Sequence, residues 1–218
     1  MPINLKALNQ IKIDIKDTNI KLMIVTKTRS IEDISELIKL GYRNFAENRV
    51  QEAYKKFTNI KSDHKINLSL IGPLQSNKVK QALKLFDTIQ SIDRNKIVDE
   101  INKNGAFITN EKKFYIQVNI GEEPQKSGVL PNNFNDLYQY CLSNHLEISG
   151  IMCIPPFDKD PRFFFDKMLK IKEKSNNNFV LSMGMSSDYK VALSYKTDEI
   201  RIGSLISVSY THLRAHEP

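Results

Sequence analysis

A lysine at the end of a short aliphatic run is the residue best placed for covalent chemistry. Lys27 directly follows LMIVT, residues 22–26. A run of this kind is typical of a buried strand, so the lysine would lie at the strand end and point into the mouth of a barrel. A partly desolvated amine loses its proton more readily and can form a Schiff base with an aldehyde. The alternative is a solvated strand-end lysine, which is the commoner role for a lysine taken alone.

Two segments near the C-terminus, MGMSSD and RIGS, have the composition of an anion site. Gly184 and Gly203 would let the backbone approach an anion. The hydroxyls of Ser186, Ser187 and Ser204 would donate hydrogen bonds to it, helped by the dipole of a following helix. The alternative is that these are ordinary turn and helix-capping residues. Because the two segments follow two successive strands, phosphate binding and an ordinary turn are equally good interpretations of them.

Arg201 adds a permanent positive charge to the second segment. It lies two residues before Gly203, so in a strand both residues point to the same side. A guanidinium can only donate hydrogen bonds. Its alternative role is an ion pair with Asp198, Glu199 or another acid. A Schiff-base lysine, a phosphate cradle and an arginine together suggest one ligand with an aldehyde, a phosphate and a ring nitrogen, namely pyridoxal phosphate (PLP).

The elements that must position these residues alternate regularly along the chain. Strands are predicted at residues 22–27, 42–45, 67–72, 88–92, 113–120, 147–154, 179–183 and 199–203. Helical periodicity follows each of the first seven strands, and a further helical segment precedes the first. Ser30 and Asp33 predict a capping box, and Gly41 predicts a left-handed helix stop. Asp93 is predicted to cap the helix after the fourth strand.

This alternation predicts the α/β class and a single-domain TIM (β/α)8 barrel. The strand spacing fits βαβ units, and aliphatic runs indicate strands buried on both faces of a parallel sheet. Eight units favour a closed barrel over an open doubly wound sheet, and they leave no space for a second domain. The domain is predicted to cover residues 1–206. The active site of such a barrel lies at the carboxyl ends of its strands, where the residues above are found.

Composition excludes several classes of protein. The 218 residues include 32 Lys and Arg against 25 Asp and Glu, which gives a net charge of +7. The lysines are dispersed and tryptophan is absent, so a nucleic-acid-binding stripe is not indicated. No apolar run approaches the roughly 18 residues that a membrane span needs, and the N-terminal segment lacks a signal-peptide core. Two cysteines and four scattered histidines predict neither a disulfide framework nor a metal site, so a cytoplasmic protein is expected.

The last residues do not continue the pattern. After GSLIS the chain reads VSYTHLRAHEP, which lacks apolar periodicity where a closing barrel helix is expected. Residues 207–218 are therefore predicted to be an atypical C-terminal tail, and no function is assigned to them.

Several motifs together resemble one protein family. They are IVTKT, FAENRVQE, IGPLQSNK, QSID, QVNIGEEPQKSGV, GIMCIPP, LSMGMSSDYKVAL and EIRIGS, spread over about residues 5–206. In combination they resemble the pyridoxal phosphate homeostasis protein family, the YggS/PROSC group. The resemblance implies a barrel like the N-terminal domain of alanine racemase. It also implies an intracellular PLP carrier or buffer that influences amino-acid and keto-acid balance, with no established turnover reaction.

The resemblance also implies the cofactor-binding residues, which are Lys27, Asn48, Ser186, Arg201, Gly203 and Ser204. Lys27 would carry PLP as a Schiff base, and Arg201 would face the pyridine nitrogen. The two serines and the glycine would hold the phosphate, and Asn48 would lie near the ring. Because Arg201 cannot give up a proton, the ring nitrogen should stay unprotonated and the ring should be a weak electron sink. Binding of PLP is therefore favoured over catalysis, with no catalytic residue predicted. The protein is also expected to be a metal-free monomer that supplies PLP to apo PLP-dependent enzymes.

The chain departs from the family pattern at four places. Ala46 stands where the family usually has glycine, and Ser69 stands where a histidine is common. Lys196 replaces a usual glycine before the last strand, where a left-handed stop favours Gly or Asn. These three changes would at most tune the pocket. The fourth is the loss of the usual IFG continuation after GSLIS, which leaves the closure of the barrel at its C-terminal end open.

A second function remains open from the sequence. The same residues could serve a PLP-dependent enzyme of fold type III, such as a racemase, lyase or decarboxylase acting on small amino acids. Racemases of this fold type also use a second domain and a tyrosine from a partner subunit, and this chain has no room for that domain. Binding and transfer are therefore favoured over catalysis.

Overall fold

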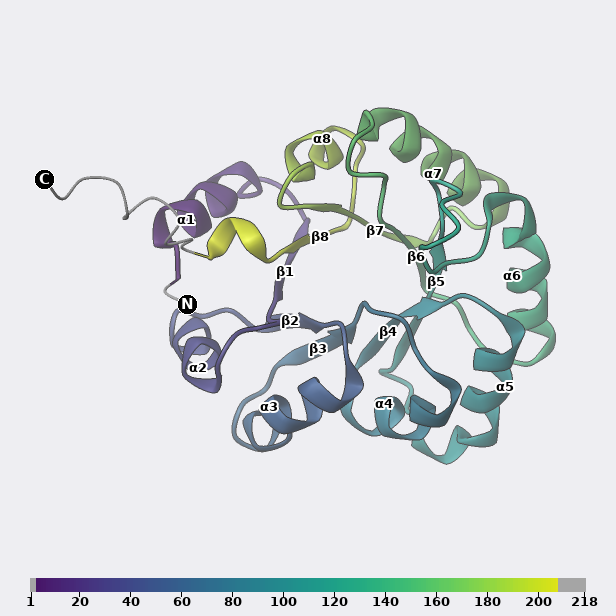
Figure 1. The fold of residues 1–218 in the computed structure, drawn as a ribbon, viewed down its shortest axis with the longest axis horizontal. Helices are drawn as coiled ribbons and strands as arrows, with labels where there is room; N and C mark the ends of the chain where they lie inside the picture. Colours follow the sequence, from purple (N-terminus) through teal and green to yellow (C-terminus); the bar gives the residue numbers. More distant parts are fainter. Residues whose placement is uncertain (1–2, 208–218) are drawn as a thin grey trace, which may run out of the picture.

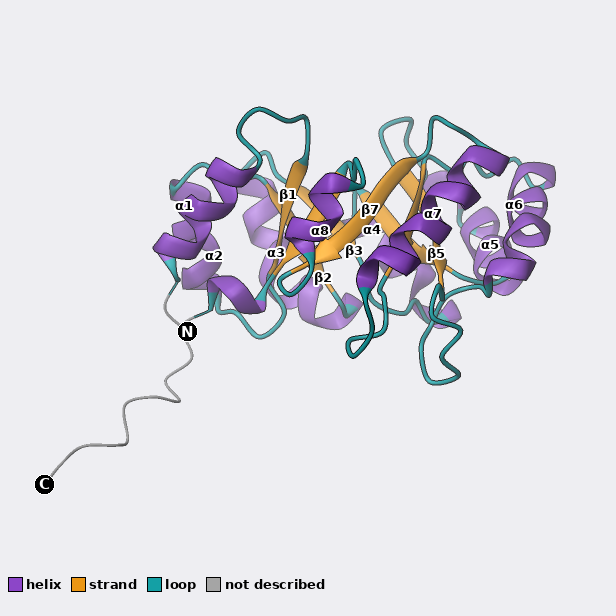
Figure 2. Cartoon of the chain, turned by 90° about the horizontal axis from the view of Figure 1, so that it is seen from above, coloured by secondary structure: helices purple, strands orange, loops and turns teal. Residues whose placement is uncertain are grey.

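The computed structural model describes residues 3–207, and its eight strands form one closed parallel barrel in the order β1 to β8. The strands lie at the centre of the molecule and the helices surround them (Figures 1 and 2). The strands are β1 (Lys21–Val25), β2 (Asn44–Glu47), β3 (Asn67–Leu70), β4 (Thr88–Ile92), β5 (Lys113–Val118), β6 (Gly150–Cys153), β7 (Val180–Met185) and β8 (Glu199–Ile202). The predicted TIM barrel is confirmed.

A helix follows each of the first seven strands, as the periodicity predicts. The helices are α1 (Leu5–Asp14), α2 (Ile31–Lys39), α3 (Val50–Asp63), α4 (Val79–Leu85), α5 (Asn95–Lys103), α6 (Phe134–Ser143), α7 (Pro161–Ser175) and α8 (Tyr189–Ser194). Short 3-10 turns are η1 (Ser76–Lys78), η2 (Gly105–Phe107), η3 (Pro131–Asn133) and η4 (Ser204–Ile206). Helix α1 precedes β1, so the number of helices equals the number of strands in the described residues.

Helix boundaries follow local side-chain chemistry. The predicted capping box at α2 is confirmed, since the Asp33 amide donates to Ser30 Oγ at 3.2 Å and the Ser30 amide donates to Asp33 Oδ2 at 3.4 Å. The prediction that Asp93 caps α5 is wrong. Arg94 occupies the N-cap position without a side-chain cap hydrogen bond, because the Asp93 carboxylate pairs with the Arg94 guanidinium at 2.5 Å.

Two strand boundaries differ from the prediction in ways that matter for the site. Strand β1 ends at Val25, so Lys27 lies in the following turn and not at the strand end. The next residue, Thr28, has a φ of 68°, which turns the chain away from the strand direction. Strand β2 begins at Asn44 and not at Tyr42, because the amide of Tyr42 still donates to the Leu37 carbonyl at the end of α2.

Apolar residues pack in two layers. The larger layer lies between the strands and the helices and includes Ile24, Phe45 and Ile202. A smaller cluster is formed by the alternate side chains of the first strands and the residue after β3, namely Met23, Val25, Ala46 and Ile71. Because side chains alternate along a strand, this second cluster occupies the inside of the barrel.

The barrel is closed between β8 and β1, although the usual IFG continuation after GSLIS is absent. The two strands pair in register from Lys21 opposite Glu199 to Ile24 opposite Ile202. Outside this seam, α1 lies beside η4 (Figure 1), and the Asn4 amide donates to the Ile206 carbonyl at 3.0 Å. The helix before β1 thus covers the seam where a helix after β8 was expected. The predicted tail lies, apart from residue 207, outside the described residues.

Two further observations bear on the expected class of protein. No helix within residues 3–207 is long and apolar enough to cross a membrane. Within the same residues, no group of three or more His, Cys, Asp or Glu side chains is placed to hold a metal ion.

Candidate functional site

A cavity of about 300 Å³ lies at the carboxyl end of the barrel. Its lining includes all six residues predicted to bind the cofactor, which are Lys27, Asn48, Ser186, Arg201, Gly203 and Ser204. The remaining lining residues, apart from Ser187, are apolar and were not singled out from the sequence: Val25, Ile71, Ile154, Phe157 and Met185. A largely apolar cavity of this size with a few convergent polar groups is typical of a small-molecule site.

Lys27 is exposed at one side of this cavity, so the expected partial desolvation of its amine is not seen. The backbone on either side of it is fixed. Thr26 Oγ1 donates to Glu47 Oε1 at 2.7 Å, and the amide of Thr28 donates to Glu52 Oε1 at 3.0 Å. The lysine side chain can therefore move while its attachment point is held.

Lys56, on α3, connects the groups that hold this turn. Its Nζ donates to the Thr26 carbonyl at 2.9 Å, to Glu47 Oε1 at 3.1 Å and to Glu52 Oε1 at 2.6 Å. Glu47 is fully buried, and burial raises the pKa of its carboxyl, while Thr26 and Lys56 oppose that shift. Glu47 is thus a buried salt-bridge partner of Lys56. The i,i+4 spacing of Glu52 and Lys56 is the sequence signal that could have indicated this cluster.

A second part of the cavity lining presents groups that suit an anion. The amides of Gly203 and Leu205 both donate to Ser186 Oγ, at 3.3 and 3.2 Å. Two backbone donors and a hydroxyl therefore converge where η4 begins, beside Ser204. A Cβ added at Gly203 would lie 3.1 Å from Val25 Cβ, so glycine lets this segment approach β1 closely.

Gly184 has a different role from the predicted one. It does not line the cavity, and its φ is 97°. A Cβ at this position would lie 2.6 Å from the Cβ of Ala192, so glycine is needed for β7 to pack against α8. The prediction that Gly184 brings the backbone to an anion is therefore wrong. Helix α8, which follows it, also lies outside the lining. The turn between β7 and α8 is closed by the Met185 amide, which donates to Asp188 Oδ1 at 2.6 Å.

Arg201 lies at the floor of the cavity and is only 2% exposed. Its Nη1 donates to the carbonyl and the hydroxyl of Ser182 at 2.6 and 2.7 Å, and its Nη2 donates to the Cys153 carbonyl at 2.7 Å. No carboxylate within residues 3–207 forms a direct ion pair with it, so the alternative role of pairing with Asp198 or Glu199 is not observed. Burial lowers the pKa of Arg201, but an arginine stays charged in proteins.

The first three departures from the family pattern can now be placed in the structure. Ala46 is fully buried in the inner cluster and packs with Val25 and Ile71, which line the cavity. Ser69 is buried in β3 but does not line the cavity. Ala46 is therefore close enough to influence the pocket shape, whereas Ser69 is not part of its lining. Lys196, the third departure, has a φ of 51°, which is the left-handed conformation predicted there.

Comparison with known proteins agrees with this geometry. A family model described as alanine racemase, N-terminal domain, matches residues 4–210. The pyridoxal phosphate homeostasis protein of Aquifex aeolicus (strain VF5) is 37% identical over 196 residues, which is 85% of each chain. That of Pasteurella multocida (strain Pm70) is 33% identical over 201 residues, covering 87% of this chain and 86% of the relative.

The chain belongs to the pyridoxal phosphate homeostasis protein family. The resemblance inferred from the motifs is confirmed. Among solved structures, PipY of Synechococcus elongatus PCC7942 with PLP bound has a TM-score of 0.80 and 26% identity, over 92% of this chain and 98% of PipY. The family barrel is therefore matched almost end to end.

Proposed function

We propose that this chain binds PLP in the cavity at the barrel mouth and acts in PLP homeostasis as a carrier or buffer. The observation that carries the proposal is that one cavity unites a primary amine, a group of anion donors and a buried arginine. These three features suit the aldehyde, the phosphate and the ring nitrogen of PLP. The relatives named PLP homeostasis proteins and the PLP-bound structure of PipY support it.

The anion donors suit the phosphate. The amides of Gly203 and Leu205 already converge on one oxygen, the Ser186 hydroxyl, and can donate to a phosphate oxygen in the same way. Ser186 and Ser204 would add hydroxyl donors. Hydrogen bonds to a charged phosphate are stronger than those to a neutral hydroxyl, so an exchange of partners is favourable.

Lys27 suits a covalent attachment. Its Nζ would add to the aldehyde carbon, and the aldehyde oxygen would leave as water when the C=N bond of the Schiff base forms. Bound PLP can act as an electron sink for carbanions. Arg201, which only donates, would hold the ring nitrogen unprotonated and weaken that property. Asn48 would border the ring. This set of residues therefore favours holding and releasing PLP over catalysis.

We further propose that residues 1–206 act as a single PLP-binding domain, as a cytoplasmic monomer that passes PLP to apo PLP-dependent enzymes. All six residues proposed to bind PLP come from one chain, which suits a monomeric carrier. Both cysteines are free and buried, which suits a reducing compartment.

The test is the visible absorbance of purified protein titrated with PLP. The wild type should develop the band of a lysine Schiff base, and Lys27→Ala should not. Lys159→Ala is the matched control, because Lys159 is also exposed near the barrel mouth but does not line this cavity. A wild-type band retained in Lys27→Ala would contradict the role of Lys27, and a folded wild type without any band would contradict PLP binding.

The same loaded protein distinguishes a carrier from an enzyme. Incubation with alanine and other small amino acids should give no steady racemisation, elimination or decarboxylation. Sustained turnover by the wild type that is abolished in Lys27→Ala would replace the carrier with a PLP-dependent enzyme of fold type III.

A further inference from the structure

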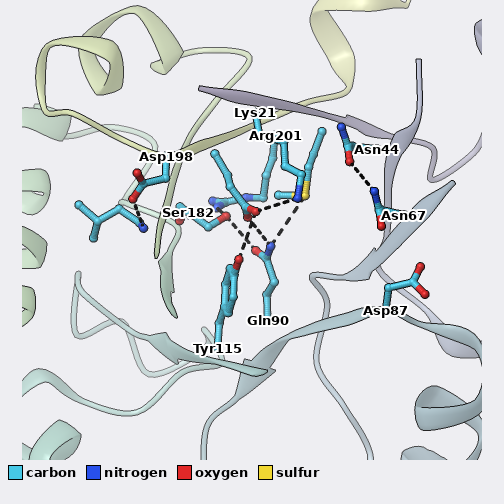
Figure 3. Close-up of polar contacts among 12 residues, drawn as sticks. Lys21, Asn44, Asn67, Asp87, Gln90, Tyr115, Ser182, Asp198 and Arg201 are labelled. Carbon is cyan, nitrogen blue, oxygen red and sulfur yellow. Dashed lines mark hydrogen bonds and ion pairs between the residues drawn. The ribbon is translucent and has the colours of Figure 1, made fainter. Parts of the chain in front are cut away.

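A row of buried polar side chains runs through the barrel interior beneath the cavity (Figure 3). Arg201 Nη1 donates to Ser182 Oγ at 2.7 Å, and Ser182 Oγ donates to Gln90 Oε1 at 2.8 Å. Gln90 Nε2 then donates to Glu199 Oε2 at 2.8 Å. Arg201 and Glu199 lie two residues apart on β8, yet they are joined through β7 and β4 and not by a direct contact. We call these four side chains the relay.

Every hydrogen bond of the relay points in the same direction, from the arginine to the carboxylate. Arg201 can only donate and an ionised Glu199 can only accept, so the two ends fix the orientation of the groups between them. The hydroxyl of Ser182 receives one hydrogen and gives its own to Gln90. Aligned hydrogen bonds polarise and strengthen one another inside a protein. The negative charge of Glu199 is thereby coupled to the guanidinium.

We propose that Ser182, Gln90 and Glu199 are positioning residues that hold Arg201 at the cavity floor and moderate its positive charge toward the bound ligand. This inference rests on the proposed function, because it assigns to the relay the control of the PLP ring environment. Without Glu199 the buried guanidinium would have no carboxylate linked to it through hydrogen bonds among residues 3–207.

Other groups also act on the two ends of the relay. Glu199 Oε1 accepts from Tyr115 OH at 3.2 Å and lies 3.5 Å from Lys21 Nζ. Burial and the nearby Glu199 raise the pKa of Tyr115, so it remains a neutral donor. At the Arg201 end, Cys153 and Asp188 oppose the lowering of the Arg201 pKa by burial. Burial raises the pKa of the Cys153 thiol to about 12, which leaves the thiol neutral. Lys21, which is partly exposed, lies at the Glu199 end of the relay and forms a direct ion pair with Glu199.

The experiment compares PLP-loaded wild type with Glu199→Gln, which keeps a hydrogen-bonding side chain but removes the charge. The readout is the pH midpoint of the visible band of bound PLP. Loss of the negative charge removes the carboxylate that is linked to Arg201 through hydrogen bonds, and this disfavours a second positive charge on Lys27 Nζ, the nitrogen of the Schiff base. The midpoint should move to lower pH by about 0.5 unit. Glu47 and Lys56, which lie behind Thr26, are the same in both proteins.

Two further variants separate the relay from general packing. Tyr115→Phe removes a hydrogen bond to Glu199 outside the relay and should leave the midpoint nearly unchanged. Ser182→Ala cuts the relay next to Arg201, and it should lower the midpoint and weaken PLP binding about fivefold. If Ser182→Ala does not fold, the pH midpoint of Glu199→Gln tests the relay. If Glu199→Gln does not fold, the pH midpoint of Ser182→Ala tests it.

Borohydride reduction and intact mass of each loaded protein distinguish the two proposals. A wild type that traps no PLP would overturn the proposed function and the relay with it. If the wild type and the variants all trap one PLP per chain but share the same pH midpoint, the relay would be overturned while the proposed function stands. A midpoint that falls in Glu199→Gln and Ser182→Ala, but not in Tyr115→Phe, supports both.

Discussion

The two sides of the cavity hold their charged side chains in opposite ways. Lys27 is exposed, and only the backbone beside it is fixed, through Thr26 and Thr28. Arg201 is buried, and its guanidinium itself is fixed by three short hydrogen bonds. A group that must form and break a bond needs freedom to meet its ligand, whereas a group that sets the ligand's electrostatic environment must stay in place. Under the proposed function, this difference assigns bond formation with the ligand to Lys27 and recognition of the ligand to Arg201.

The barrel interior shows the same contrast. Its β1–β3 side is an apolar cluster under the Lys27 turn, while its β4, β7 and β8 side carries Gln90, Ser182, Glu199 and Arg201. Buried polar groups cost stability unless each one is hydrogen-bonded. The polar side is thus the part of the core in which a single substitution should do most damage.

The largest expected effect follows directly from this comparison. Arg201→Ala should lower the free energy of unfolding by about 4 kcal/mol, because it leaves two buried carbonyls and the relay without their donor. Lys27→Ala should change it by no more than about 0.5 kcal/mol, as for other exposed sites. Urea unfolding followed by circular dichroism measures both. Equal losses of unfolding free energy in the two variants would show that Arg201 is held no more firmly by the core than Lys27 is.

The cysteines test how well the core on the Arg201 side excludes solvent and reagent. Burial raises the pKa of Cys153 and of Cys141 to about 12. At pH 8 the folded protein should therefore react with a disulfide reagent at least about 100-fold more slowly than the urea-unfolded chain. Rapid labelling of Cys153 in the folded protein would show that the strand carrying it opens, and that Arg201 is less rigidly held.

Lys56→Met tests the support behind Lys27. It leaves the buried Glu47 carboxylate without its cation, so the free energy of unfolding should fall by about 2 kcal/mol at pH 7. Because burial raises the pKa of Glu47, the folded protein binds this proton more tightly than the unfolded chain does. Stability is therefore lost as pH rises from the ordinary pKa of Glu47 through its raised value, and the variant's deficit should shrink as pH falls.

The control for that pH dependence is the double variant Glu47→Gln/Lys56→Met, which has no ionisable group at the buried position. Its deficit relative to Glu47→Gln should vary less between pH 5 and pH 7 than the deficit of Lys56→Met, because Glu52 is then the only titrating partner that Lys56 loses. A deficit of Lys56→Met that is the same at pH 5 and pH 7 would show that Lys56 acts through packing and not through the charge of Glu47.

The smallest effect concerns the turn that leads into β8, the strand that carries Arg201. Lys196 has a φ of 51°, a conformation that costs a residue with a side chain about 1 kcal/mol. Lys196→Gly should therefore raise the free energy of unfolding by about 0.5–1 kcal/mol, without changing PLP affinity. Thermal unfolding is sensitive enough to detect it. A decrease in stability would mean that contacts of the lysine side chain outweigh the backbone strain.

Sequence patterns were sufficient for the barrel and, together with the family resemblance, for the polar residues that line the cavity. The alternation of aliphatic runs and amphipathic helices predicts eight βα units, and parallel strands bring their carboxyl ends to one face. Lys27 and Arg201 could therefore be assigned to the same site although they are far apart in the chain.

Other features depend on three-dimensional packing that no local pattern encodes. Gly184 lies in a segment with the composition of an anion-binding loop, but in the structure it allows close packing against Ala192. Asp93 is a residue type that commonly caps helices, but its carboxylate forms an ion pair with Arg94. The relay depends on strand register, because Gln90 and Glu199 are brought together only by the closed barrel, and a polar residue in a strand does not reveal its partner.

The central claim is that Lys27 is the one residue that holds the ligand covalently. Borohydride reduction of the PLP-loaded protein, followed by proteolysis and mass spectrometry, tests it most directly. Attachment through Lys27 alone predicts one PLP-derived modification per chain, found on the peptide that contains Lys27. Modification spread over exposed lysines, or concentrated on a different lysine, would contradict it.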